Sequence, residues 1–213
     1  MAFDYPVTLD LAGRLCLLAG SGPLAIERLT GLLRSRADVV VLTPNPSPAL
    51  VAQCAAFNRT IIPRLPVPAD MEDATLAIVT GEDPVDVAAL HEAAAQHGTL
   101  FAALDDPAHR DFRSVSQIHR GPLTVTVSSA GTAPALTARL RRRLETELEP
   151  ELCDLAGAIG RARTAHGPPE VPFDEWTTRW ATALADLDGL VALLRKGDSD
   201  AVEAHILAAL RDG

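Results

Sequence analysis

Short apolar runs alternate with segments of helical periodicity along the first half of the chain. The runs are apolar on both faces, as expected for strands buried within a parallel sheet. In the segments between them, apolar residues recur at intervals of three and four and predict helices. We therefore expect an α/β fold, a parallel sheet with helices on both faces. The expected strands are residues 15–19, 39–42, 60–62, 76–79 and 100–104, and the expected helices are residues 23–36, 49–57 and 85–97.

The pattern changes after residue 112. Residues 115–119 and 123–129 predict two strands joined at Arg120-Gly121-Pro122, and the second strand alternates apolar with polar residues. This pair fits either an antiparallel addition to the sheet or a pairing surface for another subunit. The clearest linker is Gly167–Pro169. Beyond Pro134 the chain predicts only helices, at residues 136–148, 151–165, 173–186, 187–196 and 200–211.

A glycine-rich turn joins the first expected strand to the first expected helix. Residues Gly20-Ser21-Gly22-Pro23-Leu24-Ala25 follow a Gly-x-Gly-x-x-Ala pattern, in the strand–turn–helix context of a dinucleotide-binding fingerprint. We expect Gly20 to make the tight turn, Gly22 to let the backbone approach a pyrophosphate, and Ala25 to let helix and strand pack closely. The first N–H groups of the helix favour a phosphate at this position. A tight turn that binds no ligand is the alternative.

The amino-acid composition limits the kinds of molecule that we expect the protein to bind. The chain of 213 residues carries a net charge of −9, which disfavours a nucleic-acid surface. No apolar stretch reaches membrane-spanning length and no leader pattern precedes the first strand, so we expect a cytoplasmic protein that binds neither membranes nor nucleic acids. The three cysteines, Cys16, Cys54 and Cys153, lack metal-binding spacing, and we expect buried thiols and no resident metal.

Further motifs follow the glycine turn in a characteristic order. Thr80-Gly81-Glu82-Asp83-Pro84 follows the fourth strand, and Leu104-Asp105-Asp106-Pro107 follows the fifth. Arg120–Ser129 and Gly131-Thr132-Ala133-Pro134 then lead into an arginine-rich helix. Together these motifs closely resemble the precorrin-2 dehydrogenase/sirohydrochlorin ferrochelatase family, the N-terminal half of bifunctional siroheme synthases. The resemblance extends over essentially the whole chain.

The resemblance implies an enzyme that oxidises precorrin-2 to sirohydrochlorin with NAD, followed in many members by insertion of ferrous iron. It also implies a homodimer in which the region after the first domain is shared between subunits. Because the chain stops at Gly213 without a methyltransferase domain, we expect a free-standing member. The implied domains are a Rossmann-type NAD-binding domain (1–112), a dimerisation and substrate-site region (113–149) and a C-terminal helical domain (150–213).

Site residues also follow from the resemblance. Asp105 matches an aspartate implicated in dehydrogenation and chelation, and Ser129 matches a serine near the tetrapyrrole that is phosphorylated in a bacterial relative. The residues expected to bind the tetrapyrrole are Ser128, Ser129, Gly131 and Thr132. The residues expected to bind NAD are Gly20, Ser21, Gly22, Pro23, Leu24, Ala25, Thr43, Pro44, Thr80 and Gly81.

The position of Asp105 suits acid–base chemistry. Open α/β sheets bind ligands at the carboxyl ends of their strands, where Asp105 is expected. Dehydrogenation removes a hydride and a proton from the macrocycle, so a nearby carboxylate could act as the base, and during metal insertion it could accept a pyrrole proton. On local sequence, Asp105-Asp106-Pro107 equally suits a turn opener.

Two other features have both a functional and a structural interpretation. Arg139, Arg141, Arg142 and Arg143 could meet the carboxylates of a tetrapyrrole, or could form a solvated helix face balanced by neighbouring glutamates. His119 could hold a metal transiently, although a lone histidine in a strand is usually structural.

A second hypothesis is a nucleotide- or tetrapyrrole-binding relative without catalysis, acting as a carrier, sensor or assembly partner. Its motivation lies in departures from the family pattern: Gly81 and Glu82 replace an acidic pair, and Ala102 replaces an asparagine. The run Arg113–Ser116 and Ala133 also differ. The second strand ends without an acidic residue for a ribose 2′-hydroxyl, so this position leaves NAD and NADP open.

Overall fold

The computed structural model describes residues 5–166 and 171–212, and the linker expected at Gly167–Pro169 lies outside them. The chain divides into two compact units, Met1–Ser114 and Val115–Gly213, and each is described by itself. Among the described residues, no helix has both the length and the apolar character that a membrane span requires.

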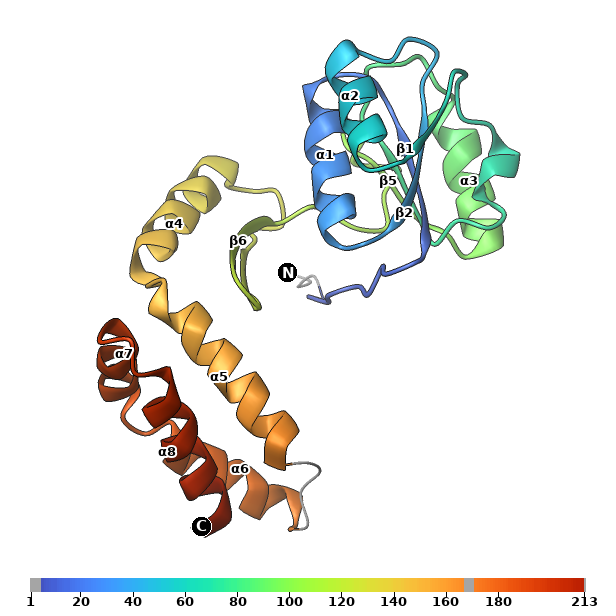
Figure 1. The fold of residues 1–213 in the computed structure, drawn as a ribbon. Helices are drawn as coiled ribbons and strands as arrows, with labels where there is room; N and C mark the ends of the chain where they lie inside the picture. The colour runs from blue at the N-terminus through green and yellow to red at the C-terminus, as the bar shows by residue number, and fades with distance from the viewer. Residues whose placement is uncertain (1–4, 167–170, 213) are drawn as a thin grey trace. The chain divides into compact units, whose positions relative to one another are not determined.

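A five-stranded parallel sheet forms the centre of the first unit, in the order β3-β2-β1-β4-β5. Helices α1 and α2 cover one face of this sheet and α3 covers the other (Figure 1). The expected α/β architecture is confirmed. The strands are β1 (Leu15–Ala19), β2 (Asp38–Leu42), β3 (Thr60–Ile62), β4 (Leu76–Val79) and β5 (Leu100–Ala103), and the helices are α1 (Pro23–Arg34), α2 (Pro48–Ala56) and α3 (Val87–His97).

Successive side chains of β1 point to opposite faces of the sheet. Cys16 and Leu18 pack in the core under α1 and α2, whereas Leu17 and Ala19 pack in the core under α3. Both cores are mainly aliphatic, with Phe101 fully buried in the second. Burial, and to a smaller extent the charge of Asp38, raises the pKa of the Cys16 thiol to about 11. This buried thiol is therefore protonated at neutral pH.

Two local elements differ from the expectations. Helix α3 begins at Val87 rather than at residue 85, because the Asp86 carboxylate accepts a hydrogen bond from Ala89 N at 3.1 Å and caps the helix there. A 3₁₀ turn, η1 (Pro68–Met71), lies in a stretch expected to be a loop. Its Asp70 carboxylate accepts from Val67 N at 2.8 Å and pairs with Arg64. In both places a nearby backbone N–H donates a hydrogen bond to an aspartate carboxylate, and this bond sets where the helical element begins.

The second unit begins with a hairpin of β6 (Ser116–Arg120) and β7 (Leu123–Val127). These strands form a separate two-stranded antiparallel sheet, so the expected alternative of an addition to the parallel sheet is wrong. Helix α4 (Pro134–Glu147) packs on the hairpin, where Glu145 pairs with both Arg120 and Arg141.

A bundle of four helices makes up the rest of the second unit. Its core contains Leu155, Trp176, Val202 and Ile206, all buried, and the Trp176 ring meets the Trp180 ring edge to face. All four helices contribute to this core, α6 with its tryptophans and the other three with aliphatic side chains, which explains the helical periodicity of this stretch. The helices are α5 (Glu151–His166), α6 (Phe173–Ala183), α7 (Leu187–Arg195) and α8 (Ser199–Asp212).

Phe101 provides a test of the core under α3. We expect Phe101→Ala to lower the free energy of unfolding of the first unit by about 3–5 kcal/mol, because it leaves a cavity among buried side chains. Phe57, which is 56% exposed, is the matched control, and Phe57→Ala should change the same quantity by less than about 0.5 kcal/mol. Urea unfolding measures both. Equal losses in the two variants would contradict the core described above.

Candidate functional site

The carboxyl ends of four parallel strands meet at one edge of the first unit's sheet. The register pairs Ala19 of β1 with Leu42 of β2 and with Val79 of β4, and pairs Val79 with Ala103 of β5. The chain therefore leaves the four strands at the same level. Strand order reverses between β1 and β4, and open α/β sheets bind ligands at such a point.

This edge brings together the expected residues of the first unit. The glycine turn follows β1, Thr43 and Pro44 follow β2, Thr80 and Gly81 follow β4, and Asp105 lies one residue beyond Leu104 after β5. The residues expected to bind the tetrapyrrole, 128–132, belong to the second unit.

The glycine turn has the backbone that its sequence predicts. Gly20 has φ +141°, in a region that favours glycine, and an added Cβ would collide with the Thr80 side chain. Gly22 is the N-cap of α1 and provides no side-chain cap, and the first turn of α1 contains no acidic residue. Its first N–H groups have no partner within the helix. The start of α1 is therefore suited to an anion.

Two buried threonines connect the loop after β4 to the ends of β1 and β2. The Thr80 hydroxyl lies within hydrogen-bond reach of Ala19 O, at 3.2 Å, and of the Glu82 carboxylate. The Thr43 hydroxyl donates to Asp83 Oδ2 at 2.8 Å. Through these contacts the loop after β4 lies against the strand ends beside it.

Asp105 is exposed and lies against Gly81. Gly81 has φ +89°, and a Cβ added there would come within 2.6 Å of the Asp105 Cγ. Because Gly81 lacks a side chain, it leaves room for the Asp105 carboxylate. A side chain added at position 81 in this structure would require Asp105 to shift.

Hydrogen bonds hold the chain that follows Asp105. His109 Nδ1 lies 2.7 Å from Asp106 Oδ2, and this bond lowers the pKa of Asp106 below its usual range. Asp111 Oδ2 accepts from Phe101 N at 2.9 Å, and Ala102 forms an isolated antiparallel bridge with Arg110. The segment that carries Asp105 thus begins and ends on β5.

The residues expected to bind the tetrapyrrole form a compact turn before α4. Ser129 Oγ accepts from Ala133 N at 3.1 Å and lies 3.0 Å from the Thr137 hydroxyl. The Thr132 hydroxyl donates to Ser129 O at 2.6 Å, and Ser128 Oγ accepts from Ala130 N at 3.2 Å. Gly131, with φ +82°, completes the turn. The Ser129 hydroxyl therefore satisfies the backbone N–H of Ala133, the N-cap residue of α4, which has no capping side chain of its own.

Several neighbours of these residues could not be identified from the sequence. Thr137 is buried and contacts Ser129 from eight residues further along the chain. Glu82 and Asp83 reach β1 and β2 across sequence separations that no local pattern encodes. One related indication of these contacts was present in the sequence, which was the departure at Gly81 and Glu82 from the pattern of the family that the chain resembles.

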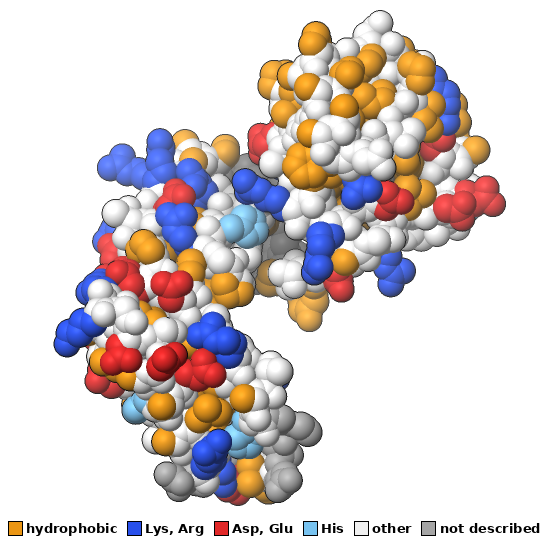
Figure 2. All heavy atoms as spheres, viewed as in Figure 1, with side chains coloured by type: hydrophobic (Ala, Val, Ile, Leu, Met, Phe, Trp, Pro, Cys, Tyr) orange, Lys and Arg blue, Asp and Glu red, His pale blue; other side chains and the backbone are white. Residues whose placement is uncertain are grey.

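The second unit also holds the arginines and the histidine that the sequence singled out. Figure 2 shows Lys and Arg side chains gathered over α4, where Arg139, Arg142 and Arg143 are exposed and Arg141 donates to Glu145 at 2.7 Å. His119 Nδ1 lies 3.1 Å from the Thr124 hydroxyl across the hairpin. Within residues 5–166 and 171–212, no group of three or more His, Cys, Asp or Glu side chains could hold a metal ion.

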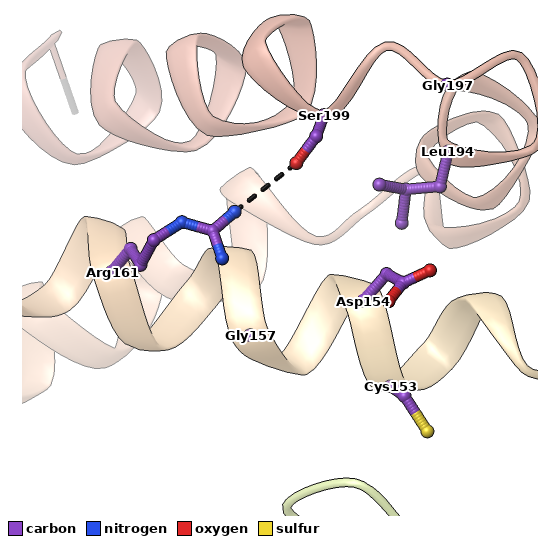
Figure 3. A pocket seen from close by; sticks show the side chains of 7 residues that line it. All are labelled: Cys153, Asp154, Gly157, Arg161, Leu194, Gly197 and Ser199. Carbon is purple, nitrogen blue, oxygen red and sulfur yellow. Dashed lines mark hydrogen bonds between the residues drawn. The ribbon is translucent and has the colours of Figure 1, made fainter.

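A cavity of about 320 Å³ opens beside α5 in the second unit. Arg161 donates to Ser199 Oγ at 3.3 Å and to Glu203 Oε2 at 3.0 Å, so its charge is already compensated within the unit. None of the expected site residues lines this cavity, and we assign it no ligand. Its lining residues, shown in Figure 3, are Cys153, Asp154, Gly157, Arg161, Leu194, Gly197 and Ser199.

Comparison with known proteins places these features in a family. A family model described as putative NAD(P)-binding matches residues 7–116, and one described as sirohaem biosynthesis protein central matches residues 120–147. The first model covers half of the chain and includes the whole glycine turn. It supports a nicotinamide cofactor without distinguishing NAD from NADP.

Similar relatives are siroheme synthases. Siroheme synthase 2 of Aeromonas salmonicida is 32% identical over 95% of this chain and 42% of its own length. The siroheme synthase of Azotobacter vinelandii is 32% identical over 75% of this chain and 35% of its own length. The chain thus spans about two fifths of the length of the first of these relatives.

A solved structure described as "SirC, precorrin-2 dehydrogenase" has the same fold. It superposes with a TM-score of 0.70 at 20% identity, over 94% of this chain and 100% of that one. The two family models, over residues 7–116 and 120–147, and the similarity to siroheme synthases confirm the resemblance drawn from the sequence. The chain belongs to the precorrin-2 dehydrogenase/sirohydrochlorin ferrochelatase family of siroheme biosynthesis.

Proposed function

We propose that this protein is an NAD-dependent dehydrogenase that oxidises precorrin-2 to sirohydrochlorin. The observation that carries the proposal is the alignment of the glycine turn and Asp105 at one edge of the same parallel sheet. A dinucleotide site and a candidate base are then close enough to serve one reaction. Membership of the family supports this choice of reaction.

The residues of the glycine turn fit a dinucleotide. Gly20 and Gly22 lack the Cβ atoms that would collide with neighbouring side chains, and the start of α1 carries no acidic residue of its own. We assign the pyrophosphate to Gly20–Ala25, with Thr43 and Pro44 beside a ribose and Thr80 and Gly81 on the adjoining loop. The nicotinamide ring of a bound NAD would accept the hydride.

Asp105 is the proposed base. Its carboxylate is exposed, so it can meet a substrate, and its contact with Gly81 holds it beside the loop after β4. It accepts the proton that leaves the macrocycle during dehydrogenation. As a subsidiary proposal, the same carboxylate accepts a pyrrole proton during the insertion of iron.

The turn before α4 is the proposed contact for the carboxylates of the tetrapyrrole. Ser128, Ser129, Gly131 and Thr132 present hydroxyl and N–H groups ahead of α4, whose first turn contains no acidic residue. Such a helix start favours an anionic group.

One assay decides between this proposal and a binding protein without catalysis. Purified protein is mixed with precorrin-2 and NAD⁺, and the absorbance of sirohydrochlorin is followed. Formation of sirohydrochlorin supports the dehydrogenase. Binding of NAD⁺ without turnover would support the alternative, which the replacements Gly81 and Ala102 motivate.

Asp105→Asn tests the role of the base. We expect it to lower the rate of sirohydrochlorin formation by about 10²–10⁴-fold, because the amide cannot accept the proton, while leaving the affinity for NAD⁺ unchanged. Asp73→Asn is the matched control, since Asp73 is exposed and lies before β4, at the amino end of the sheet. Initial rates and NAD⁺ titrations measure both effects. Full activity of Asp105→Asn would remove Asp105 from the mechanism.

We also propose a homodimer formed through α4. Leu136, Leu140 and Leu144 are 56%, 41% and 38% exposed, and their spacing of four residues puts them in one stripe along the helix. An exposed apolar stripe of this kind suits a protein interface.

Leu140→Lys tests this interface. A lysine in an apolar contact is costly to bury, so we expect the variant to elute as a monomer where the unchanged protein elutes as a dimer. Leu187, 46% exposed at the start of α7, is the control, and Leu187→Lys should remain dimeric. Size-exclusion chromatography with light scattering measures the mass. A monomeric unchanged protein, or a dimeric Leu140→Lys, would contradict the proposal.

A further inference from the structure

The Glu82 carboxylate lies on the glycine turn. Its Oε1 is 2.5 Å from the position that a Cβ on Gly22 would take, and its Oε2 is 2.6 Å from the corresponding position on Gly20. The Thr80 hydroxyl donates a hydrogen bond to Oε2. Glu82 thus fills the space that the absence of two side chains leaves open beside the turn.

The Glu82 carboxylate places a negative charge beside the start of α1, where the helix has no acidic residue of its own. The N-cap Gly22 offers no side-chain acceptor, the residue after it is a proline, and no acidic residue occurs in the first turn. A negative group beside the start of such a helix is stabilised by the helix dipole and by its free N–H groups. Glu82 supplies that negative group from a different loop, across the end of β1.

The pyrophosphate of the proposed nucleotide and the Glu82 carboxylate would occupy the same position beside the glycine turn. The proposed nucleotide brings its phosphates to the backbone of Gly20 and Gly22, because that is where close approach is possible. Two anions cannot share this position without strong repulsion. Glu82 is exposed, so its side chain has solvent to move into.

We propose that Glu82 is an internal competitor of the nucleotide: its carboxylate occupies the pyrophosphate position in the free protein, and the nucleotide must displace it to bind. Glu82 thereby sets the affinity for the cofactor. This inference rests on the proposed nucleotide site at Gly20–Ala25 and adds to it the device that limits binding.

The test is the dissociation constant of NAD⁺, measured by isothermal titration calorimetry on the full chain. We expect Glu82→Gln and Glu82→Ala to bind NAD⁺ about five- to twentyfold more tightly than the unchanged protein, because neither variant holds an anion against the start of α1. Glu92→Gln, an exposed glutamate of α3, is the matched control and should leave the constant unchanged. NADP⁺ and ADP-ribose, which also carry the pyrophosphate, should show the same gain.

The outcomes separate this proposal from the nucleotide site itself. If the Glu82 variants bind NAD⁺ as the unchanged protein does, or more weakly, Glu82 is not a competitor, while the nucleotide site stands. If neither the unchanged protein nor any variant binds NAD⁺, NADP⁺ or ADP-ribose, both proposals are wrong. Circular dichroism of each variant establishes that it is folded.

Discussion

The parallel register of β1 with its two neighbours is the constraint on which the site depends. Because Ala19 pairs with both Leu42 and Val79, the chain leaves three adjacent strands at one level, and β5 continues the row. The buried apolar faces of β1 maintain this register, since a shift would move Leu17 and Leu18 into the wrong cores. Core packing thus determines where the glycine turn and Asp105 lie.

Missing side chains are as important at this edge as those present. Gly20 and Gly22 leave the space that Glu82 enters, and Gly81 leaves the space that Asp105 enters. The glycines therefore leave room for two carboxylates that belong to other loops. Glu82 lies beside the start of α1, where we propose that the pyrophosphate binds, so competition between carboxylate and phosphate is the central electrostatic question.

The sequence was sufficient for the elements and for the family, but not for the contacts between loops. Apolar runs and the glycine turn predicted β1, α1 and their neighbours because these patterns are local. The start of α3 at Val87 depends on the Asp86 cap, and the separate hairpin of β6 and β7 depends on pairing that periodicity does not encode. The contact of Glu82 with the glycine turn joins segments sixty residues apart. This separation is far beyond the windows of about 11–18 residues over which local periodicity is informative.

We propose that a nicotinamide dinucleotide binds at the carboxyl edge of this sheet beside Asp105. A crystal structure of the protein with NAD⁺ is the decisive test. We expect the pyrophosphate against the backbone of Gly20 and Gly22 at the start of α1, with the nicotinamide ring toward Asp105. A nucleotide bound elsewhere on the chain, or a nicotinamide ring directed away from Asp105, would contradict it.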